Sequence, residues 1–208
     1  MSNKPIITTP FSRRFRGLMP VVIDIETAGL NSGTDALLEI AAVMLAMDDE
    51  GKLYPKQTHA YHIEPFTGAR IEQESLEITG IDPTHPLRLA LPEGQALERI
   101  FAVVRTELEK NLCYRAVLVG HNAWFDLSFL LAAARRCGIR FNPFHTFTTL
   151  DTATLGAVAL GETVLARCTR RARIEFDMQQ AHSAIYDAQK TADLFCFIAN
   201  KWRGNGGK

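Results

Sequence analysis

Two carboxylates interrupt an otherwise apolar run near the start of the chain, VVIDIETAGL at residues 21–30. Side chains of a β-strand alternate between its two faces, so Asp24 and Glu26, two residues apart, share one face. Without a cation between them the two carboxylates repel each other, at a cost that grows with burial. A strand with one solvated face explains the pair equally well, so the pair alone does not establish a site.

A second acidic segment is HNAWFDLSF at residues 121–129, directly after the short β-branched run AVLVG. The pattern predicts a helix with Asn122 as its N-cap and Asp126 four residues later on the same face. Helix capping alone also accounts for both side chains, because acids near a helix N-terminus are favourable.

The third candidate segment is AHSAIYD at residues 181–187, in which His182 and Asp187 are five residues apart. Five helical steps rotate by roughly 140°, so one regular helix cannot direct both side chains at one target. We expect Asp187 on a helix and His182 in the loop before it. A solvated histidine and a surface acid are the alternative for this segment in isolation.

Taken together, the three segments supply four acids and one histidine from three separate elements. Carboxylate oxygens are preferred ligands of Mg²⁺, and two cations about 4 Å apart can share them while stabilising the attacking and departing oxygens of a phosphoryl transfer. The combination therefore predicts a site for two Mg²⁺ ions.

The elements that must position these groups can be read from the pattern of apolar residues and turns. Strands are expected at 20–26, 37–47, 59–64, 116–120 and 147–151, and helices within 68–80 and at about 92–110, 122–138, 163–171 and 184–202. Three strands followed by alternating helices and strands predict an α/β fold with a mixed sheet. Ligands usually lie at the C-terminal ends of the parallel strands in such sheets.

Length and composition fit one globular domain spanning residues 1–208, with a basic N-terminal segment at about 1–17 and a frayed tail at about 203–208. Lys plus Arg equals Asp plus Glu at 23 each, so net charge does not indicate a nucleic-acid partner. Arginines nevertheless cluster locally: the span 135–173 contains seven (135, 136, 140, 167, 170, 171 and 173) against two acids.

The four cysteines form no CxxC pair, and we expect them to be buried, reduced thiols. No apolar run reaches the roughly 18 residues that a membrane helix needs, and Asp24 and Glu26 interrupt the first apolar segment where a signal peptide would need its core. These observations predict a cytoplasmic protein with no membrane partner.

The three ordered motifs, DIE at 24–26, HNAWFD at 121–126 and HSAIYD at 182–187, resemble those of the histidine-containing DEDD (DEDDh) superfamily of 3′-to-5′ exonucleases. Within it the chain is most similar to the ribonuclease T family, on the stretches RFRG, PVVIDIETAG, TDALLEIAAV, GIDP, NPFH and QAHSAIYD. The resemblance implies a ribonuclease H-like fold: a mixed sheet of about five strands flanked by helices.

The resemblance also implies roles for the candidate residues. Asp24 would contact both Mg²⁺ ions, for which Mn²⁺ can substitute, Glu26 and Asp187 would complete the first site, and Asp126 would help hold the second. His182 would be the general base that releases a nucleoside 5′-monophosphate. Such enzymes are homodimers that trim single-stranded 3′ ends of structured RNAs such as tRNA and rRNA precursors, and single-stranded DNA is a further expected substrate.

Substrate contacts are likewise implied by resemblance. The residues expected to contact the 3′-terminal nucleotides are Thr27, Ala28, Glu74, Asn122, Phe125 and Phe147. Leu30 and Ile78 stand where two further stacking phenylalanines would be expected, so the family's slowing at 3′ cytosines is not expected to carry over unchanged. Arg14, Arg16, Arg115 and Arg140 would form a patch that grips duplex RNA for the partner's active site, weakened by Glu109.

Other readings of the same residues remain open. A polymerase proofreading subunit or an oligoribonuclease would share the three motifs, although RFRG and NPFH argue against both. The phenylalanines alone are equally explained as core, and the arginines as a solvated surface. A non-catalytic RNA-binding module would be expected to have lost an acid or His182, and a hydrolase of small phosphodiesters would not depend on nucleic-acid length.

Overall fold

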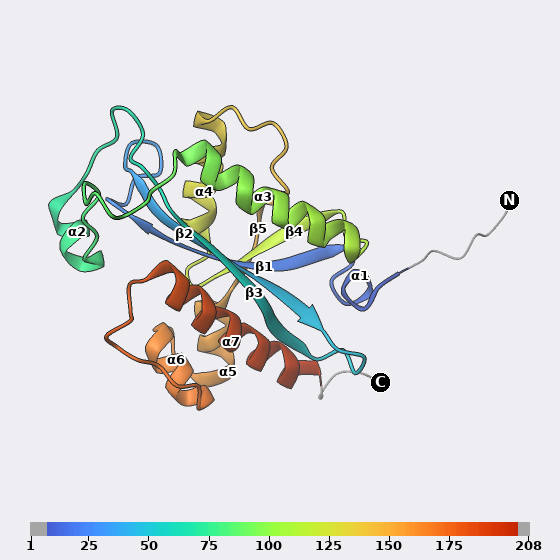
Figure 1. The fold of residues 1–208 in the computed structure, drawn as a ribbon. Helices are drawn as coiled ribbons and strands as arrows, with labels where there is room; N and C mark the ends of the chain where they lie inside the picture. The colour runs from blue at the N-terminus through green and yellow to red at the C-terminus, as the bar shows by residue number, and fades with distance from the viewer. Residues whose placement is uncertain (1–7, 204–208) are drawn as a thin grey trace, which may run out of the picture.

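One mixed sheet organises the protein, and its strands lie in the order β3–β2–β1–β4–β5 (Figure 1). The computed structural model describes residues 8–203. β1 is antiparallel to β2 and parallel to β4, and β4 is parallel to β5. The strands are β1 (Leu18–Thr27), β2 (Leu37–Met47), β3 (Leu53–His62), β4 (Arg115–Gly120) and β5 (Phe144–Asp151). The expected α/β fold with a mixed, ribonuclease H-like sheet is confirmed.

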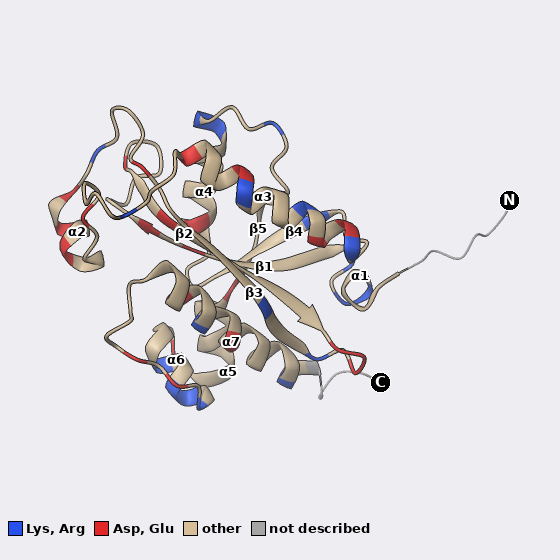
Figure 2. Cartoon of the chain, viewed as in Figure 1, with Lys and Arg blue, Asp and Glu red and all other residues tan. Residues whose placement is uncertain are grey.

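Helices cover both faces of this sheet. In Figure 1, α3 and α4 lie on one side, while α5, α6 and α7 lie on the other. The helices are α1 (Pro10–Arg14), α2 (Gln73–Thr79), α3 (Glu93–Lys110), α4 (Trp124–Arg136), α5 (Thr152–Leu160), α6 (Leu165–Ala172) and α7 (Ala184–Arg203). Lys and Arg lie on several separate elements, including α1, α3 and α6 (Figure 2).

The central strand β1 is buried from both sides, which explains its nearly continuous apolar sequence. Val21, Val22 and Ile23 have no exposed surface, as expected for a strand covered by helices on both faces. The apolar stripe predicted for α3 packs in the same core, where the following residues are buried: Ala96, Leu97, Ile100, Phe101, Val104 and Leu108. The core therefore fixes the position of the acids that interrupt β1.

Several element boundaries differ from the sequence-based expectation. β3 begins at Leu53, six residues before the expected start, because its first half is a polar edge strand that carries Pro55. β5 begins at Phe144 rather than residue 147. Neither α1 nor α5 was predicted: α1 has only five residues, and α5 has small apolar residues without helical periodicity.

The remaining whole-chain expectations have mixed outcomes. All four cysteines are free, and Cys168 and Cys196 are buried, but Cys113 is half-buried and Cys137 is exposed, so the expectation of buried thiols is wrong for Cys137. Among residues 8–203, no helix is long and apolar enough to cross a membrane. Residues 204–208 of the expected frayed tail lie outside the described residues.

Candidate active site

The C-terminal half of β1 and the first turn of α7 bring three acids together. Asp24 and Glu26 lie on β1, and Asp187 lies in the first turn of α7. One carboxylate oxygen from each lies within 4.8 Å of the others. This spacing suits a shared cation, because oxygen ligands of one Mg²⁺ ion lie about 2.1 Å from the metal.

The fourth acid, Asp126, is only 4% exposed in the first turn of α4. Its carboxylate accepts a hydrogen bond from the backbone N–H of Ile25, the residue between the two β1 acids. Gly120 at the end of β4 permits this approach, since a Cβ there would lie 3.0 Å from Asp126 Oδ2 and 3.0 Å from the Ala123 backbone. The sequence HNAWFD thus delivers its acid to the side of β1.

Burial and like charge together raise the pKa values of this cluster. The pKa of Asp24 is raised well above its ordinary value by burial, and then by the charges of Asp126, Glu26 and Asp187. Burial, followed by the charges of Asp187, Glu39 and Asp126, raises the pKa of Glu26 to about 8. Such a cluster holds more negative charge than the protein itself neutralises, which a divalent cation would relieve.

Asp187 shows most directly that the residues present fit a metal ion. Its Oδ2 accepts a hydrogen bond from the backbone N–H of His182 at 3.0 Å. Its Oδ1 is buried and has no hydrogen-bond partner among the described residues. A buried carboxylate oxygen without a donor is costly, and Asp187 belongs to the three-acid group. The donor set consists only of hard oxygens, as Mg²⁺ requires.

His182 precedes α7, in the loop predicted for it, and Asp187 lies on the helix, so the expected division is confirmed. His182 is exposed and has a φ of 66°, a left-handed conformation that few non-glycine residues adopt. Its backbone N–H donates to Asp187, and the residue lines an open pocket together with Glu39 and His62. The histidine is therefore anchored at its backbone and accessible at its ring.

The expectation that Asn122 caps α4 is wrong. The N-cap position is Ala123, and Asn122 precedes it with a φ of 69°. Asn122 and Asp126 therefore do not share a helical face. The backbone N–H of Asn122 donates to Asp151 Oδ1 at 2.9 Å, and the same carboxylate caps α5. Asparagine suits this position because it tolerates the left-handed conformation.

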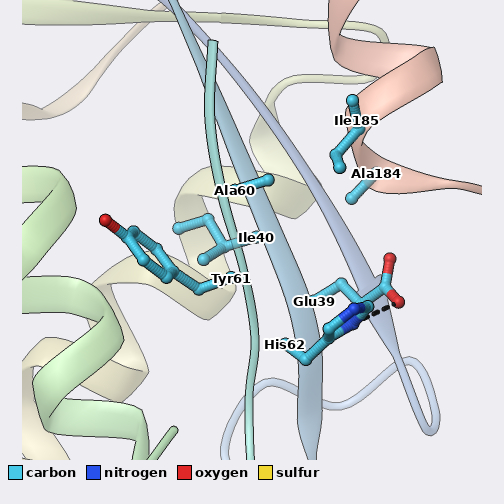
Figure 3. A pocket seen from close by; sticks show the side chains of 7 residues that line it. All are labelled: Glu39, Ile40, Ala60, Tyr61, His62, Ala184 and Ile185. Carbon is cyan, nitrogen blue, oxygen red and sulfur yellow. Dashed lines mark hydrogen bonds and ion pairs between the residues drawn. The ribbon is translucent and has the colours of Figure 1, made fainter. Parts of the chain in front are cut away.

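A fifth acid, which lies outside the three sequence motifs, borders the cluster. Glu39 of β2 lies opposite Glu26 in the strand pairing, and its charge raises the pKa values of Asp24 and Glu26. Glu39 Oε1 lies 2.8 Å from His62 Nδ1, and α7 faces this pair across a small pocket (Figure 3). Glu39 is the only charged residue of β2, which was the available signal.

The expected substrate-contact residues have different surroundings. Leu30, Ile78 and Phe147 are 79%, 59% and 81% exposed, whereas Phe125 is half-buried with its ring centroid 5.0 Å from that of Phe129. Glu74 is exposed in the first turn of α2.

The backbone expected to line the terminal nucleotide is itself hydrogen-bonded within the protein. The N–H of Ala28 donates to Ala36 O, and its carbonyl accepts from Glu72 N. The hydroxyl of Thr27 donates to Gly29 O at 2.7 Å. These bonds hold the segment after β1 rigidly against α2.

The four arginines of the expected RNA patch divide into two kinds. Arg14 donates to Gly51 O at 2.9 Å and to Ala199 O at 2.6 Å, and Arg115 donates to Asn142 O. Arg16 and Arg140 are exposed, with no side-chain hydrogen bond or ion pair to any residue that the structure describes. Two members of the set therefore help to hold the fold.

Comparison with known proteins gives consistent matches. A family model described as "Exonuclease" (RNase_T) matches residues 21–195. Ribonuclease T of Hahella chejuensis is 57% identical over 205 residues, which cover 99% of this chain and 93% of that protein. Ribonuclease T of Vibrio parahaemolyticus is 56% identical over 196 residues, covering 94% and 92% respectively.

The fold resembles that of E. coli exonuclease I. The structure of that enzyme in complex with a dT13 oligonucleotide matches with a TM-score of 0.68 and 17% identity over 90% of this chain. A zinc-bound form of its complex with single-stranded DNA matches with a TM-score of 0.68 and 18% identity over 89% of this chain. This chain spans 42% of the length of exonuclease I in the first case and 41% in the second.

Proposed function

The chain belongs to the RNase_T exonuclease family, and on that premise we propose that it is a Mg²⁺-dependent 3′-to-5′ exoribonuclease. It would trim single-stranded 3′ ends of structured RNAs such as tRNA and rRNA precursors, and would also degrade single-stranded DNA from the 3′ end. The observation that carries the proposal is the group formed by Asp24, Glu26 and Asp187, with their oxygens within 4.8 Å of each other.

Four acids would hold two cations in this proposal. Asp24 belongs to the group with Glu26 and Asp187, and the charge of Asp126 also raises its pKa. Asp24 would therefore serve both cations, Glu26 and Asp187 the first, and Asp126 the second. When bound, Mg²⁺, or Mn²⁺ in its place, would supply the positive charge that activates water and stabilises the reacting phosphate.

His182 would accept the proton of the attacking water. His182 is exposed, its backbone N–H donates to Asp187, and histidine is the side chain that most often acts as a general base. Attack on the last phosphodiester bond would break the bond between phosphorus and the 3′ oxygen of the preceding nucleotide. The products are a nucleoside 5′-monophosphate and an RNA shortened by one nucleotide.

Recognition of the 3′ end would come from residues of β1 and the segment after it, α2, α4 and β5. Phe125 and Phe147 would stack on terminal bases, an interaction worth about 1–3 kcal/mol per base. Glu74 would contact a base, and the segment at Thr27 and Ala28 would line the last nucleotide. Leu30 and Ile78 offer exposed aliphatic surface where aromatic rings would stack better, so a terminal-base preference should be weak.

We further propose that the protein is a cytoplasmic homodimer in which each subunit's basic patch serves the partner's active site. Arg16 and Arg140 are the members of that patch whose exposed side chains have no hydrogen bond or ion pair within residues 8–203, which supports a role for them in contacting phosphates. Arg14 and Arg115 would contribute charge from positions fixed by backbone carbonyls.

The test is digestion of an RNA hairpin with a single-stranded 3′ tail, in Mg²⁺ or in EDTA, by the wild type and by His182→Ala. We expect Mg²⁺-dependent release of 5′-monophosphates that stalls near the duplex and falls by at least about 100-fold in His182→Ala. RNA that is bound but remains intact in Mg²⁺ would instead support a binding module. Equal rates on dinucleotides and tailed hairpins would indicate a phosphodiesterase that does not depend on length.

A further inference from the structure

The short helix α6 has two faces of opposite character. Cys168, Thr169 and Ala172 are buried, and Cys168 and Ala172 pack with α7 residues in a small core. The exposed residues include four arginines, which we call the α6 arginine surface: Arg167, Arg170, Arg171 and Arg173. Figure 2 shows Lys and Arg gathered on this helix. A protein with no net charge thus carries a local excess of positive charge here.

This charge takes almost no part in holding the fold. Arg171 lies 3.5 Å from Glu162, and the other three make no side-chain hydrogen bond or ion pair with any residue in 8–203. Arg88 and Arg136, by contrast, are engaged within the fold: Arg88 donates to two backbone carbonyls, and Arg136 pairs with a buried carboxylate. The α6 arginine surface is therefore available to a partner.

Helix stability does not explain all of these arginines. Arg170 and Arg171 lie in the last turn, where positive charge is favourable to the helix dipole. Arg167 lies in the first turn, where the dipole disfavours positive charge. Arg173 ends the helix with a φ of 61°, although α2 and α5 end in the same conformation at glycines, which adopt it without strain.

The position of α6 connects it to the active site at both ends. Before the helix, Thr163 O lies 2.7 Å from His121 Nε2, and His121 begins the segment that carries Asp126. After the helix, residues 173–183, which include His182, lead to the start of α7 at Ala184 (Figure 1). α6 is therefore linked at one end, by this hydrogen bond, to the segment that carries Asp126 and at the other, by the chain, to the helix that carries Asp187, while the acids themselves repel an approaching polyanion.

We infer that the α6 arginine surface binds the phosphate backbone of the RNA chain whose 3′ end occupies the active site of the same protomer. This inference rests on the proposed function. A helix of eight residues is about 12 Å long, which suits contact with two or three phosphates of an extended strand. Because arginine contacts to phosphates do not read bases, this surface would add affinity without adding sequence preference.

The test compares two triple variants of equal charge. The first is Arg167→Ala, Arg170→Ala and Arg173→Gly, in which the glycine relieves the left-handed backbone. The control is Lys52→Ala, Arg135→Ala and Lys201→Ala, three exposed cations that lie outside α6. Binding of a 3′-tailed RNA hairpin is measured in EDTA across a range of salt concentrations, and exonuclease kinetics are measured in Mg²⁺. Thermal melting of each variant checks that it is folded.

We expect the α6 variant to bind the tailed hairpin at least about tenfold more weakly at 0.1 M salt. The slope of log K against log salt should shrink by about 2, since each lost contact to a single strand contributes about 0.7. KM for the hairpin should rise at unchanged kcat, and activity on a dinucleotide should stay constant. The control should match the wild type.

Equal weakening in the control variant, or an unchanged salt slope in the α6 variant, would overturn the inference. Failure of the proposed function has a different signature: the wild type would release no 5′-monophosphates, whatever the binding data show. If dinucleotide activity fell together with hairpin activity in a folded α6 variant, the helix would act on the catalytic centre rather than on the RNA backbone.

Discussion

Two regions of the protein bury carboxylates, and they differ in whether a neighbouring cation neutralises the negative charge. At the start of α3, Glu93 accepts hydrogen bonds from Arg136 Nε at 2.9 Å and Nη2 at 2.6 Å. The same guanidinium lies 3.8 Å from the ring centroid of Phe66. In the active site, Asp24, Glu26 and Asp187 form no ion pair with Lys, Arg or His among the described residues.

Because both regions contain buried acids, burial alone does not identify a functional acid. Glu93 has its compensating charge inside the protein, so its pair with Arg136 joins α3 to α4 as a structural contact. The β1 acids leave their charge uncompensated, and Asp187 keeps one buried oxygen without a donor. A site that stores uncompensated charge is prepared for a ligand of opposite sign, at a cost to the stability of the ligand-free fold.

The largest expected effect is that of Asp24→Asn. Because Asp24 would contact both cations, we expect kcat on a tailed RNA to fall by at least about 1,000-fold, equivalent to roughly 4 kcal/mol of lost transition-state stabilisation. In EDTA the variant should melt at a higher temperature than the wild type, because one member of a repelling cluster is neutral. A lower melting temperature in EDTA would mean that Asp24 is structural, as Glu93 is.

Glu93→Ala should produce the opposite pattern. Removing one partner of a buried ion pair leaves the other uncompensated, and we expect a loss of about 3–5 kcal/mol in the free energy of unfolding. The kcat of the folded fraction should remain within about twofold of the wild type. Glu98→Ala is the matched control, because the pair of Glu98 with Arg105 at 3.2 Å is exposed and should contribute less than about 1 kcal/mol. For both variants, denaturant unfolding measures the loss of stability, and steady-state kinetics measure kcat.

The active-site acids should also make the stability of the metal-free protein depend on pH. The pKa of Glu26 is raised to about 8 from an ordinary 4.5, so the folded metal-free protein holds a proton that the unfolded chain has lost. Between these two values, folding stability in EDTA should therefore fall as the pH rises. Mg²⁺ requires the deprotonated carboxylates, so the rise in melting temperature caused by Mg²⁺ should be larger at pH 8.5 than at pH 6. A stabilisation by Mg²⁺ that is independent of pH would contradict this.

The sequence could predict those features that depend on neighbouring residues, and it could not predict those that depend on residues distant in the chain. Asp24 and Glu26 stand out because each breaks an apolar strand pattern, and that pattern is local. His182 and Asp187 could be assigned to loop and helix from helical geometry alone. The fold class followed from the same patterns, since the order of strands and helices restricts the possible sheets.

Other features depend on residues that are distant in the sequence. Arg14 was expected in an RNA patch, yet it donates to carbonyls 37 and 185 residues away. Asn122 was expected to cap α4, but a carboxylate from β5 fixes its backbone in the left-handed conformation. The unpredicted first half of β3 forms because β2 offers an edge to pair with, and its own sequence is polar.

Glu39 is an intermediate case between the two regions, and Glu39→Gln should have the smallest effect. Its carboxylate pairs with His62, as a structural acid would, but its charge also raises the pKa values of Asp24 and Glu26. Replacing it with glutamine should lower both pKa values and weaken the attraction for a cation. We expect the pH at which Mg²⁺ stabilises the fold to move down by less than about one unit, with kcat lowered by less than about tenfold.

Glu77→Gln, on the exposed side of α2, is the control and should change neither the pH dependence nor kcat. If melting curves of Glu39→Gln in Mg²⁺ and EDTA matched those of the control at every pH, Glu39 would belong with Glu93 as a structural acid.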